Sequence, residues 1–591
     1  MNIEQQLKSD ISLALKSLFD DDSEVVIQPT RKDFDGTYTF VVFPLVKKLR
    51  KSPVEIGKTI GAHLAEHSAL VSDFNVVQGF LNLVLADSAW LGLFNSLLGS
   101  QNKADFDNKN KSILVEFSSP NTNKPLHLGH LRNNFLGSSV SGILAANGYD
   151  VSKVCLVNDR GIHICKSMIA YQRFGNGETP GTAGIKGDHL AGKYYVAFDK
   201  AYKVEISNLM AAGHSEEEAK KNAPLIKEAQ GMLQKWESGD TEVVELWKKM
   251  NAWVYAGFNA TYNKIGVSFD KTYYESDTYV LGKDLVDEGL EKGVFFKKED
   301  NSVWIDLTED GMDEKLVLRG DSTSVYITQD LGTTELKFKD FGSEKAIWVV
   351  GNEQDYHFRV LFAIMKKLGR SYADGCYHLS YGMVDLPSGK MKSREGTVVD
   401  ADDLVAEMIA TAKATTEERG KIASFDEVEK AALFEMLALG ALKYFLLKVD
   451  PKKKMLFDPA ESIDFQGNTG PFIQYTHARI KSILRKASKE ELSIPTEIAK
   501  STMAGVETDL IYLLSEYKNT LDRSASEYAP SIVANYCYDL AKTFNSFYAE
   551  LSVMNESDLA IRDFRLALIQ QVAATIKKGM GLLGIQVPER M

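Results

Sequence analysis

Cysteine is scarce in this chain: there are four among 591 residues, and no two of them form a C-x-x-C pair. This scarcity argues against a disulfide framework and against a zinc site built from cysteine pairs. Cys155, His163 and Cys165 are close in sequence, but no second pair of ligands accompanies them. The sequence therefore predicts free thiols and no metal site held by the protein.

Long apolar runs are also missing, since none approaches the ~18 residues needed to cross a bilayer. The N-terminal segment carries acidic and alternating charges, unlike a signal or transit peptide. These absences predict a cytoplasmic protein with no membrane partner.

An excess of positive charge is absent as well, because the formal net charge is −12. Nucleic-acid-binding surfaces are ordinarily basic, so this balance argues mildly against such a partner. Basic clusters at residues 47–51, 452–454 and 479–486 leave two interpretations open, positive strips on an acidic body or ordinary solvated charge. The acidic excess could also steer a cationic ligand toward the chain.

The remaining composition is that of a large globular protein, and the pattern along the chain divides it into three parts. Residues 1–105 alternate helical and strand-like segments and end in a polar tether, which predicts an α+β accessory domain. Residues 112–405 alternate β runs with helices, the pattern of a doubly wound parallel sheet, with an insertion at about 173–297. Residues 406–591 show helical periodicity, typical of a helical bundle. The expected fold is multidomain, α/β followed by α.

The most informative stretch joins an apolar run at residues 113–117 to His127-Leu128-Gly129-His130 and a helix-like pattern that follows. A strand, a turn and a helix N-terminus form an anion site, because free backbone N–H groups and the helix dipole point at the charge. His127, His130 and Lys124 on such a turn favour stabilisation of a phosphate chain with developing negative charge. Gly129 would let a flat base lie on the backbone. The alternative is a pair of surface histidines one helical turn apart.

A second cluster, the basic segment at residues 389–397 (GKMKSREGT), follows turn-forming residues and is expected on an exposed loop. Cations on a glycine-flanked loop can close over a triphosphate and neutralise leaving pyrophosphate. Taken alone, the segment fits a solvated basic loop better than a nucleotide site. Its occurrence together with the histidine motif favours a nucleotide site.

These two segments resemble the signatures of the class I aminoacyl-tRNA synthetases, a HIGH-type motif and a KMSKS-type loop. Within that class the chain is similar to the arginyl enzymes over nearly all of its length. Four blocks carry the similarity: EFSSPN at 116–121 leading into HLGHLRNN, YITQD at 326–330, GNEQDYHF at 351–358, and the C-terminal VPERM.

The resemblance implies an arginine–tRNA ligase that uses ATP with Mg²⁺ to activate L-arginine and transfers it to the 3′ end of tRNA(Arg). It implies a Rossmann-like catalytic domain at 112–405, an accessory tRNA-binding domain at 1–105 and an anticodon-binding domain at 406–591. A monomer is expected, with tRNA(Arg), L-arginine and ATP as partners.

The resemblance also assigns the amino-acid pocket. It gives Glu116, Tyr326 and Asp330 to the guanidinium of arginine, and Asn121 and Gln354 to the α-amino end. A guanidinium binds well to carboxylates, each of which can accept two hydrogen bonds. Glu116 and Asp330 are both expected at the carboxyl ends of predicted strands, which is the ligand-binding edge of such sheets. Any one of the five could instead be a helix cap or a surface pair.

The nucleotide and catalytic residues follow from the two signatures. The residues expected at ATP are Ser118, Pro120, His127, Gly129, His130, Lys390, Met391 and Ser393. The residues expected to act in catalysis are His127, His130, Lys124, Lys392 and Arg394.

The loop departs from the class pattern. Lys392 stands where the KMSKS-type loop usually has its first serine. Arg394 stands in the part of the loop that usually ends in lysine and serine. Arginyl enzymes commonly use a lysine just ahead of the HIGH motif, and Lys124 occupies that position. Which of the three contacts pyrophosphate stays open, and His163, where many relatives carry glutamine, receives no role.

In the C-terminal part, Phe472, Tyr475, His477 and Arg479 match the family's tRNA-binding pattern. Aromatic side chains beside cations suit the stacking of unpaired bases. The alternative is that these aromatics belong to the core of the bundle.

Two other functions share part of this pattern. A smaller nucleotidyltransferase of the HxGH type would share the first motif and the sheet but has no use for so long a helical bundle. A synthetase-like RNA-binding protein without catalysis would lose the histidine motif, the basic segment or the two carboxylates expected at the guanidinium, and all three features are present.

Overall fold

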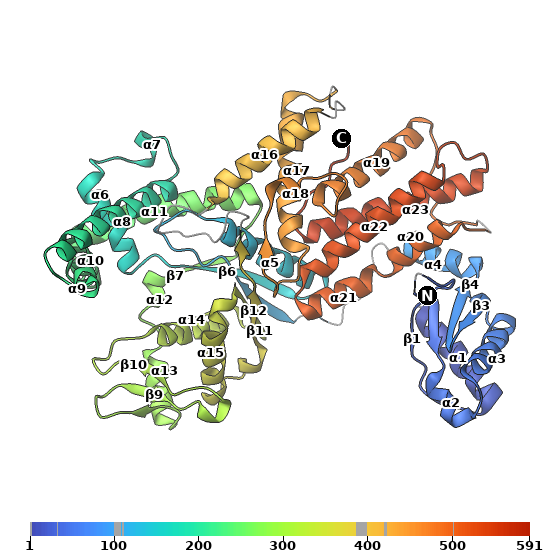
Figure 1. The fold of residues 1–591 in the computed structure, drawn as a ribbon, viewed down its shortest axis with the longest axis horizontal. Helices are drawn as coiled ribbons and strands as arrows, with labels where there is room; N and C mark the ends of the chain where they lie inside the picture. Colours follow the sequence, from blue (N-terminus) through green and yellow to red (C-terminus); the bar gives the residue numbers. More distant parts are fainter. Residues whose placement is uncertain are drawn as a thin grey trace.

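The computed structural model describes residues 3–31, 33–99, 108, 111–385, 399–418, 422, 424–499 and 502–591. Figure 1 shows a central α/β body, two outlying lobes that the body supports, a helical domain and a separate N-terminal domain. The multidomain arrangement expected from the sequence is therefore confirmed.

A five-stranded, fully parallel sheet forms the centre of the molecule, in the order β12-β11-β5-β6-β7. Its strands are β5 (Ser112–Glu116), β6 (Asp150–Val157), β7 (Lys271–Tyr274), β11 (Lys345–Gly351) and β12 (Cys376–Tyr381). Four of them are the apolar runs read from the sequence, as expected for strands buried on both faces. The fifth, β7, lies inside residues 173–297, which the sequence assigned to the insertion. Four residues are too few for a periodicity to distinguish a strand.

The strand order places the ligand crevice. Strands β6 and β7 follow β5 on one side, and β11 and β12 follow later in the chain on the other side of β5. A doubly wound sheet opens its crevice at the carboxyl ends of the two strands where the direction reverses, here β5 and β11. Helix α5 (Leu128–Ala146) begins beside that point.

Two lobes interrupt and extend the sheet, and both lie at the left of Figure 1. The first is helical and has its own apolar core. The second packs a small antiparallel sheet, in the order β10-β9-β8, against two helices. The first lobe contains α6 (Ile162–Phe174), α7 (Pro180–Ala183), α8 (Gly187–Ala211), α9 (Glu216–Asn222), α10 (Pro224–Glu237) and α11 (Thr241–Ile265). The second contains α12 (Glu275–Thr278), α13 (Lys283–Glu291), β8 (Phe296–Lys297), β9 (Val303–Ile305), η1 (Thr308–Asp310), β10 (Lys315–Leu318), α14 (Tyr326–Phe341), η2 (Asn352–Gln354), α15 (Asp355–Lys367) and η3 (Ala373–Gly375).

The C-terminal part is a helical bundle, as its periodicity predicted. Its helices are α16 (Ala401–Glu418), α17 (Glu427–Leu447), α18 (Pro459–Ser462), α19 (Gly470–Lys489), α20 (Gly505–Ser515), α21 (Tyr517–Glu527), α22 (Pro530–Glu550) and α23 (Leu559–Leu582). One short parallel pair, β13 (Val384–Asp385) with β14 (Met455–Leu456), ties the end of the catalytic sheet to the start of the bundle. Among the described helices, none has the length and apolarity required to cross a membrane.

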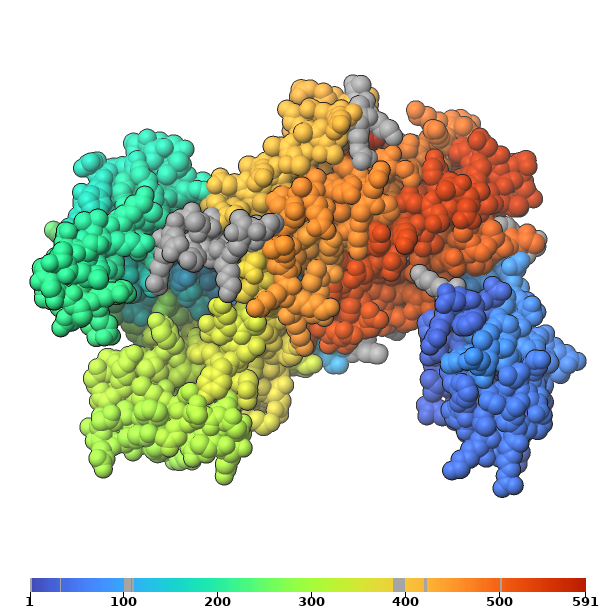
Figure 2. All heavy atoms as spheres, viewed as in Figure 1, coloured from blue at the N-terminus to red at the C-terminus, as the bar shows by residue number. Residues whose placement is uncertain are grey.

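The N-terminal domain packs helices on a four-stranded antiparallel sheet and joins the rest of the molecule beside the bundle (Figures 1 and 2). Its elements are α1 (Ile3–Phe19), β1 (Ile27–Pro29), β2 (Tyr38–Val41), α2 (Phe43–Leu49), α3 (Pro53–His67), β3 (Val71–Val77), β4 (Phe80–Leu85) and α4 (Asp87–Gly99). Helix α4 packs on the bundle, with the rings of Phe94 and Phe564 centred 5.5 Å apart. Asn95 exchanges two hydrogen bonds with the backbone of Ile498, at 2.9 and 3.0 Å. A cut at residue 105 would therefore remove a helix that the bundle's core uses.

Candidate active site

The turn between β5 and α5 carries the histidine motif, and we call residues 124–130 the histidine turn. His127 is the N-cap of α5, and its Nδ1 accepts a hydrogen bond from the Gly129 backbone N–H at 3.1 Å. The Nδ1 of His130 accepts one from the backbone N–H of His127, also at 3.1 Å. The two rings are centred 3.9 Å apart. The rings thus take the place of a serine–glutamate capping box at the start of the helix.

These backbone contacts fix the chemical form of both rings. An Nδ1 that accepts from an N–H carries no proton, so each neutral ring bears its hydrogen on Nε2. Burial, and secondarily the charge of Lys124, lowers the pKa of His127 to about 3. Burial, His127 and Lys124 together hold the pKa of His130 well below its usual range. The motif therefore presents two neutral Nε2–H donors beside the positive end of the α5 dipole.

The residues that lead into the turn shape the backbone. Ser118 adopts a positive φ of 84°, its N–H donates to Asn133 Oδ1 at 2.6 Å, and its hydroxyl is 2.6 Å from the hydroxyl of Tyr262. The carbonyl of Pro120 accepts from the Asn158 N–H at 2.9 Å. A side chain on Gly129 would meet the His127 ring at 3.0 Å, so this ring covers the glycine that was expected to face a base.

Asn133, from the HLRNN block, holds the crevice together from inside α5. Besides accepting from Ser118, its side-chain amide donates to the Val349 carbonyl of β11 at 2.7 Å and to the Tyr381 hydroxyl at 3.2 Å. Sequence reasoning gave this residue no role. Its signal would have been an amide on the buried side of a helix, where it must find partners.

Lys124 and His127 border a cavity of about 510 Å³ between the histidine turn and α8. His189 and Asp400 also line it. His163, for which the sequence suggested no role, lies nearby with its Nδ1 3.0 Å from the hydroxyl of Tyr195, another lining residue.

The basic segment lies outside the described residues, including Lys390, Met391, Lys392, Ser393 and Arg394. The chain is described again from residue 399, and we call residues 399–403 the stem. The Val399 carbonyl accepts from the Leu128 N–H at 3.2 Å, and the Ala401 N–H donates to the Leu126 carbonyl at 3.0 Å. The stem is therefore paired with the histidine turn.

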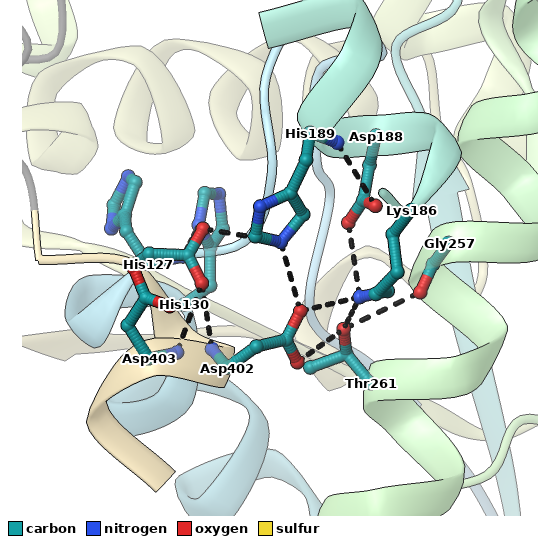
Figure 3. A network of polar contacts seen from close by, with 10 residues as sticks. His127, His130, Lys186, Asp188, His189, Gly257, Thr261, Asp402 and Asp403 are labelled. Atoms are coloured by element: carbon teal, nitrogen blue, oxygen red, sulfur yellow. Dashed lines mark hydrogen bonds and ion pairs between the residues drawn. The ribbon is translucent and has the colours of Figure 1, made fainter. Parts of the chain in front are cut away.

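A cluster of charged groups surrounds the stem, and Figure 3 shows it beside the two histidines. Asp188, His189 and Asp402 bring ligand atoms within 4.8 Å of one another, a spacing that could hold a metal ion. However, the ammonium group of Lys186 contacts both carboxylates and already supplies positive charge there. The cluster is better described as an ion-pair network than as a metal centre.

Tyr326 and Asp330 lie one turn apart on α14, and Tyr326 is 78% exposed. The prediction that Asp330 follows a strand is wrong, because residues 325–328 are the N-cap and first turn of a helix. A short apolar run cannot separate the two structures. The carboxylate of Asp330 pairs with His357 Nε2 at 2.6 Å and stays partly exposed.

Asn121 and Gln354 follow two adjacent strands at their carboxyl ends, β5 and β11, and both are exposed. Asn121 forms a parallel bridge with Asn158, just beyond β6. Both amides therefore lie at the edge of the sheet where the crevice opens.

Glu116, at the end of β5, is placed differently from Asp330. It is buried and forms an ion pair with the buried Lys337 of α14. Its carboxylate is engaged inside the sheet–helix interface, so the structure does not bring it together with Asp330 as an open acceptor.

Two further acids were missed in the sequence: Glu275, close enough to Asp330 for their charges to interact, and Asp159, which interacts in the same way with Glu275. Glu275 begins α12 after β7, and Asp159 follows β6 and accepts from the Ser276 N–H at 2.8 Å and the Tyr255 hydroxyl at 2.7 Å. Burial, with the nearby charges of Asp159 and Asp330 and against that of Arg160, raises the pKa of Glu275 to about 7. We call Asp159, Glu275 and Asp330 the acidic pocket.

The four residues expected at tRNA divide into two kinds. His477 is buried and its Nδ1 is 2.9 Å from the Pro588 carbonyl, while Phe472 packs on Tyr538. The Arg479 guanidinium lies over the rings of Tyr475, at 4.8 Å, and of Tyr548, at 5.2 Å. The second pair is the one that combines an aromatic ring with a cation near the surface.

Comparison with known proteins agrees with this architecture. Residues 94–458 match the family described as tRNA synthetases class I (R), catalytic domain. A parallel sheet with a histidine pair at its switch point is thus the centre of a class I aminoacyl-tRNA synthetase.

The flanking domains narrow the class. Residues 5–85 match the arginyl tRNA synthetase N terminal domain, and residues 473–591 match the DALR anticodon binding domain. The arginine–tRNA ligase of Amoebophilus asiaticus is 54% identical over 596 residues, and that of Bacteroides thetaiotaomicron is 53% identical over 597, each aligned over all of both chains. The structure of Thermus thermophilus arginyl-tRNA synthetase superimposes with a TM-score of 0.79 at 26% identity, covering all of both chains. The chain belongs to the arginine–tRNA ligase family.

Proposed function

We propose that this chain activates L-arginine with ATP and transfers the arginyl group to the terminal ribose of tRNA(Arg). The observation that supports this best is the histidine turn, because two neutral Nε2–H donors and a helix N-terminus meet at the switch point of the sheet. ATP would enter as its Mg²⁺ complex, since the ion neutralises part of the triphosphate charge.

In the activation step, the arginine carboxylate would attack the α-phosphorus in line, and the bond to pyrophosphate would break. The Nε2–H donors of His127 and His130 would stabilise the charge that develops on the phosphate oxygens, without proton transfer. Lys124, at the entrance of the turn, would add positive charge. Lys392 and Arg394 are proposed for the same task from the sequence alone. The nucleotide contacts proposed with them are those of Ser118, Pro120, Gly129, Lys390, Met391 and Ser393.

The acidic pocket would bind the guanidinium. Asp330 and Glu275 offer carboxylates of different burial, which suits a planar cation that donates several hydrogen bonds. Tyr326, one turn before Asp330, would border the same site. Glu116 could contribute only by exchanging Lys337 for the substrate. Asn121 and Gln354, at the crevice edge, would bind the α-amino group.

The tRNA would extend from the catalytic edge to the helical bundle. Its terminal ribose hydroxyl would attack the arginyl carbonyl of the adenylate and release AMP. On the bundle, Tyr475 and Arg479 are favoured over His477 as partners of unpaired bases, because His477 is buried whereas the Arg479 guanidinium lies over the half-buried Tyr475 ring. Phe472 is also half-buried but has no such cation over its ring among the described contacts. The proposed acting unit is a monomer, as expected from the sequence.

Exchange of labelled pyrophosphate into ATP tests the function. We expect exchange only when L-arginine and tRNA(Arg) are both present, since the arginyl enzymes that the sequence resembles usually require bound tRNA before they activate arginine. Exchange driven by another amino acid, or none under any condition, would contradict the proposal.

A further inference from the structure

The ion-pair network beside the histidine turn joins three segments that are far apart in the sequence. Lys186 and His189 come from the start of α8, Thr261 from α11, and Asp400 and Asp402 from the stem. Figure 3 shows the side chains of Lys186, His189 and Asp402 converging, with His127 and His130 to their left. The network therefore connects the inserted helical lobe to the edge of the active site.

Asp402 is the residue on which these contacts meet. One carboxylate oxygen pairs with the Lys186 ammonium and lies 3.1 Å from His189 Nε2, and the other accepts from the Thr261 hydroxyl at 3.0 Å. Lys186 also donates to Thr261 at 2.7 Å. Although burial opposes it, hydrogen bonding from His189 and Lys186 lowers the pKa of Asp402 to about 2, so the carboxylate is charged at neutral pH.

Asp400 caps the same turn from within the stem. Its Oδ1 accepts from the backbone N–H of Asp402 at 2.8 Å and of Asp403 at 3.2 Å, and its Oδ2 is 3.5 Å from His189 Nε2. The backbone of Asp400 bridges that of His127 in antiparallel fashion. A displacement of this turn would therefore be transmitted to His127 through the two backbone hydrogen bonds of this bridge.

The stem is held from two sides. On one side it is paired with the histidine turn, and on the other Asp402 fastens it to α8 and α11. Backbone pairing alone would leave the stem free to slide or to rotate away from the lobe. The three contacts of Asp402 remove that freedom.

We propose that Asp402 is a positioning residue that holds the stem against the histidine turn and so aligns that turn for the activation step. The proposal rests on the proposed function, since it concerns the same reaction. Asp402 itself touches no reacting atom: it acts through Lys186, His189 and the stem.

The test uses the full-length protein with Asp402→Asn, which keeps the size of the side chain and removes its charge. Asp403→Asn is the matched control, because Asp403 is the next residue of the same helical turn and has an exposed side chain. Lys186→Met removes the opposite charge while keeping an unbranched chain of similar length. The double variant Asp402→Asn/Lys186→Met measures whether the two act together.

The rate constant that reports alignment comes from single-turnover formation of arginyl-tRNA, with enzyme in excess of tRNA and with saturating ATP and arginine. A separate active-site titration gives the amplitude that counts active molecules. We expect Asp402→Asn and Lys186→Met each to lower the rate constant about 10- to 100-fold, as small misplacements of reacting groups do. The KM for arginine should stay within about twofold of wild type, and the double variant should be no slower than the slower single one. Asp403→Asn should match wild type.

A loss of amplitude with a wild-type rate constant in Asp402→Asn would overturn the inference, because it would mean that the network only supports folding. Equal effects of Asp402→Asn and Asp403→Asn would do the same. A wild-type protein that forms no arginyl-tRNA would instead contradict the proposed function.

Discussion

The histidine turn and the acidic pocket lie at the same edge of one sheet but are constructed in opposite ways. The turn takes its donors from one uninterrupted tetrapeptide, and the backbone of that tetrapeptide fixes their orientation. The pocket takes its carboxylates from three separate elements, with Asp159 after β6, Glu275 on α12 and Asp330 on α14. The proposed phosphate side of the site is thus a local structure, whereas the proposed amino-acid side exists only when the whole catalytic domain is folded.

Because of this contrast, we expect Asp330→Asn to have the largest effect on arginine kinetics while leaving ATP binding unchanged. Removing one charge from a pocket that pairs with a cation costs about 2–5 kcal/mol, so kcat/KM for arginine should fall roughly 30- to 5,000-fold. The KM for ATP should hardly change, because the histidine turn does not depend on Asp330. Steady-state kinetics with each substrate varied in turn measures both. A thermal melt that drops while arginine kinetics stay normal would remove Asp330 from the pocket.

Substitution of the turn should give the opposite signature. His130→Ala removes one Nε2–H donor, and the loss of one such donor lowers kcat about 100- to 1,000-fold. The backbone bond to His127 is also lost, which costs about 1 kcal/mol of stability, as for other helix caps. Single-turnover kinetics beside a thermal melt separates the two effects. An increase in the KM for arginine with an unchanged kcat would mean that the histidine turn binds arginine rather than phosphate.

The two sides should also differ in their response to pH. Because the pKa of Glu275 is raised to about 7 and arginine favours the charged carboxylate, arginine binding should strengthen as pH rises through 7. Between about pH 6 and pH 8 the gain should be about 10-fold, which is the change in the ionised fraction. Equilibrium binding of arginine measures this, and Glu275→Gln should flatten the profile. An unchanged slope in that variant would assign the titration to another group.

The smallest effect is expected from the N-terminal domain, which borders neither side. Deleting residues 1–86 leaves α4 on the bundle, so arginine activation at saturating tRNA should change by no more than about twofold, while tRNA affinity weakens. Extending the deletion to residue 99 exposes Phe564 and should lower the melting temperature. Equal melting of the two truncations would show that α4 contributes nothing to the bundle.

The same contrast explains what could be predicted from the sequence. The strand–turn–helix of the histidine motif, four strands of the sheet and the long helices of the bundle were predicted, because each is encoded by a contiguous pattern. Glu275 was missed because its raised pKa results from burial and from the charges of Asp159 and Asp330. Both acids are far from Glu275 in the sequence. The network of Asp402 was missed for the same reason, since its partners lie more than a hundred residues away along the chain.

Glu116 shows the limit of residue-by-residue transfer. The motif places it correctly at the end of β5, but its engagement by Lys337 depends on a helix that begins some two hundred residues later. For Tyr326 and Asp330 the sequence predicted a strand where the structure has the start of a helix. The polar and apolar pattern of a helix start is short, so it cannot be distinguished from that of a strand.

Because the two histidines cap α5, formation of the first turn of this helix also sets the tautomer of both rings. The first turn of α5 cannot form with its backbone satisfied unless both rings take the tautomer that points an N–H into the crevice. No later protonation or rearrangement is needed to prepare these donors. A molecule whose α5 has frayed at its start would lose them at once, even with the rest of the sheet intact. Heating should therefore inactivate this enzyme in step with the fraying of a single helical turn, ahead of the unfolding of the domain that carries it.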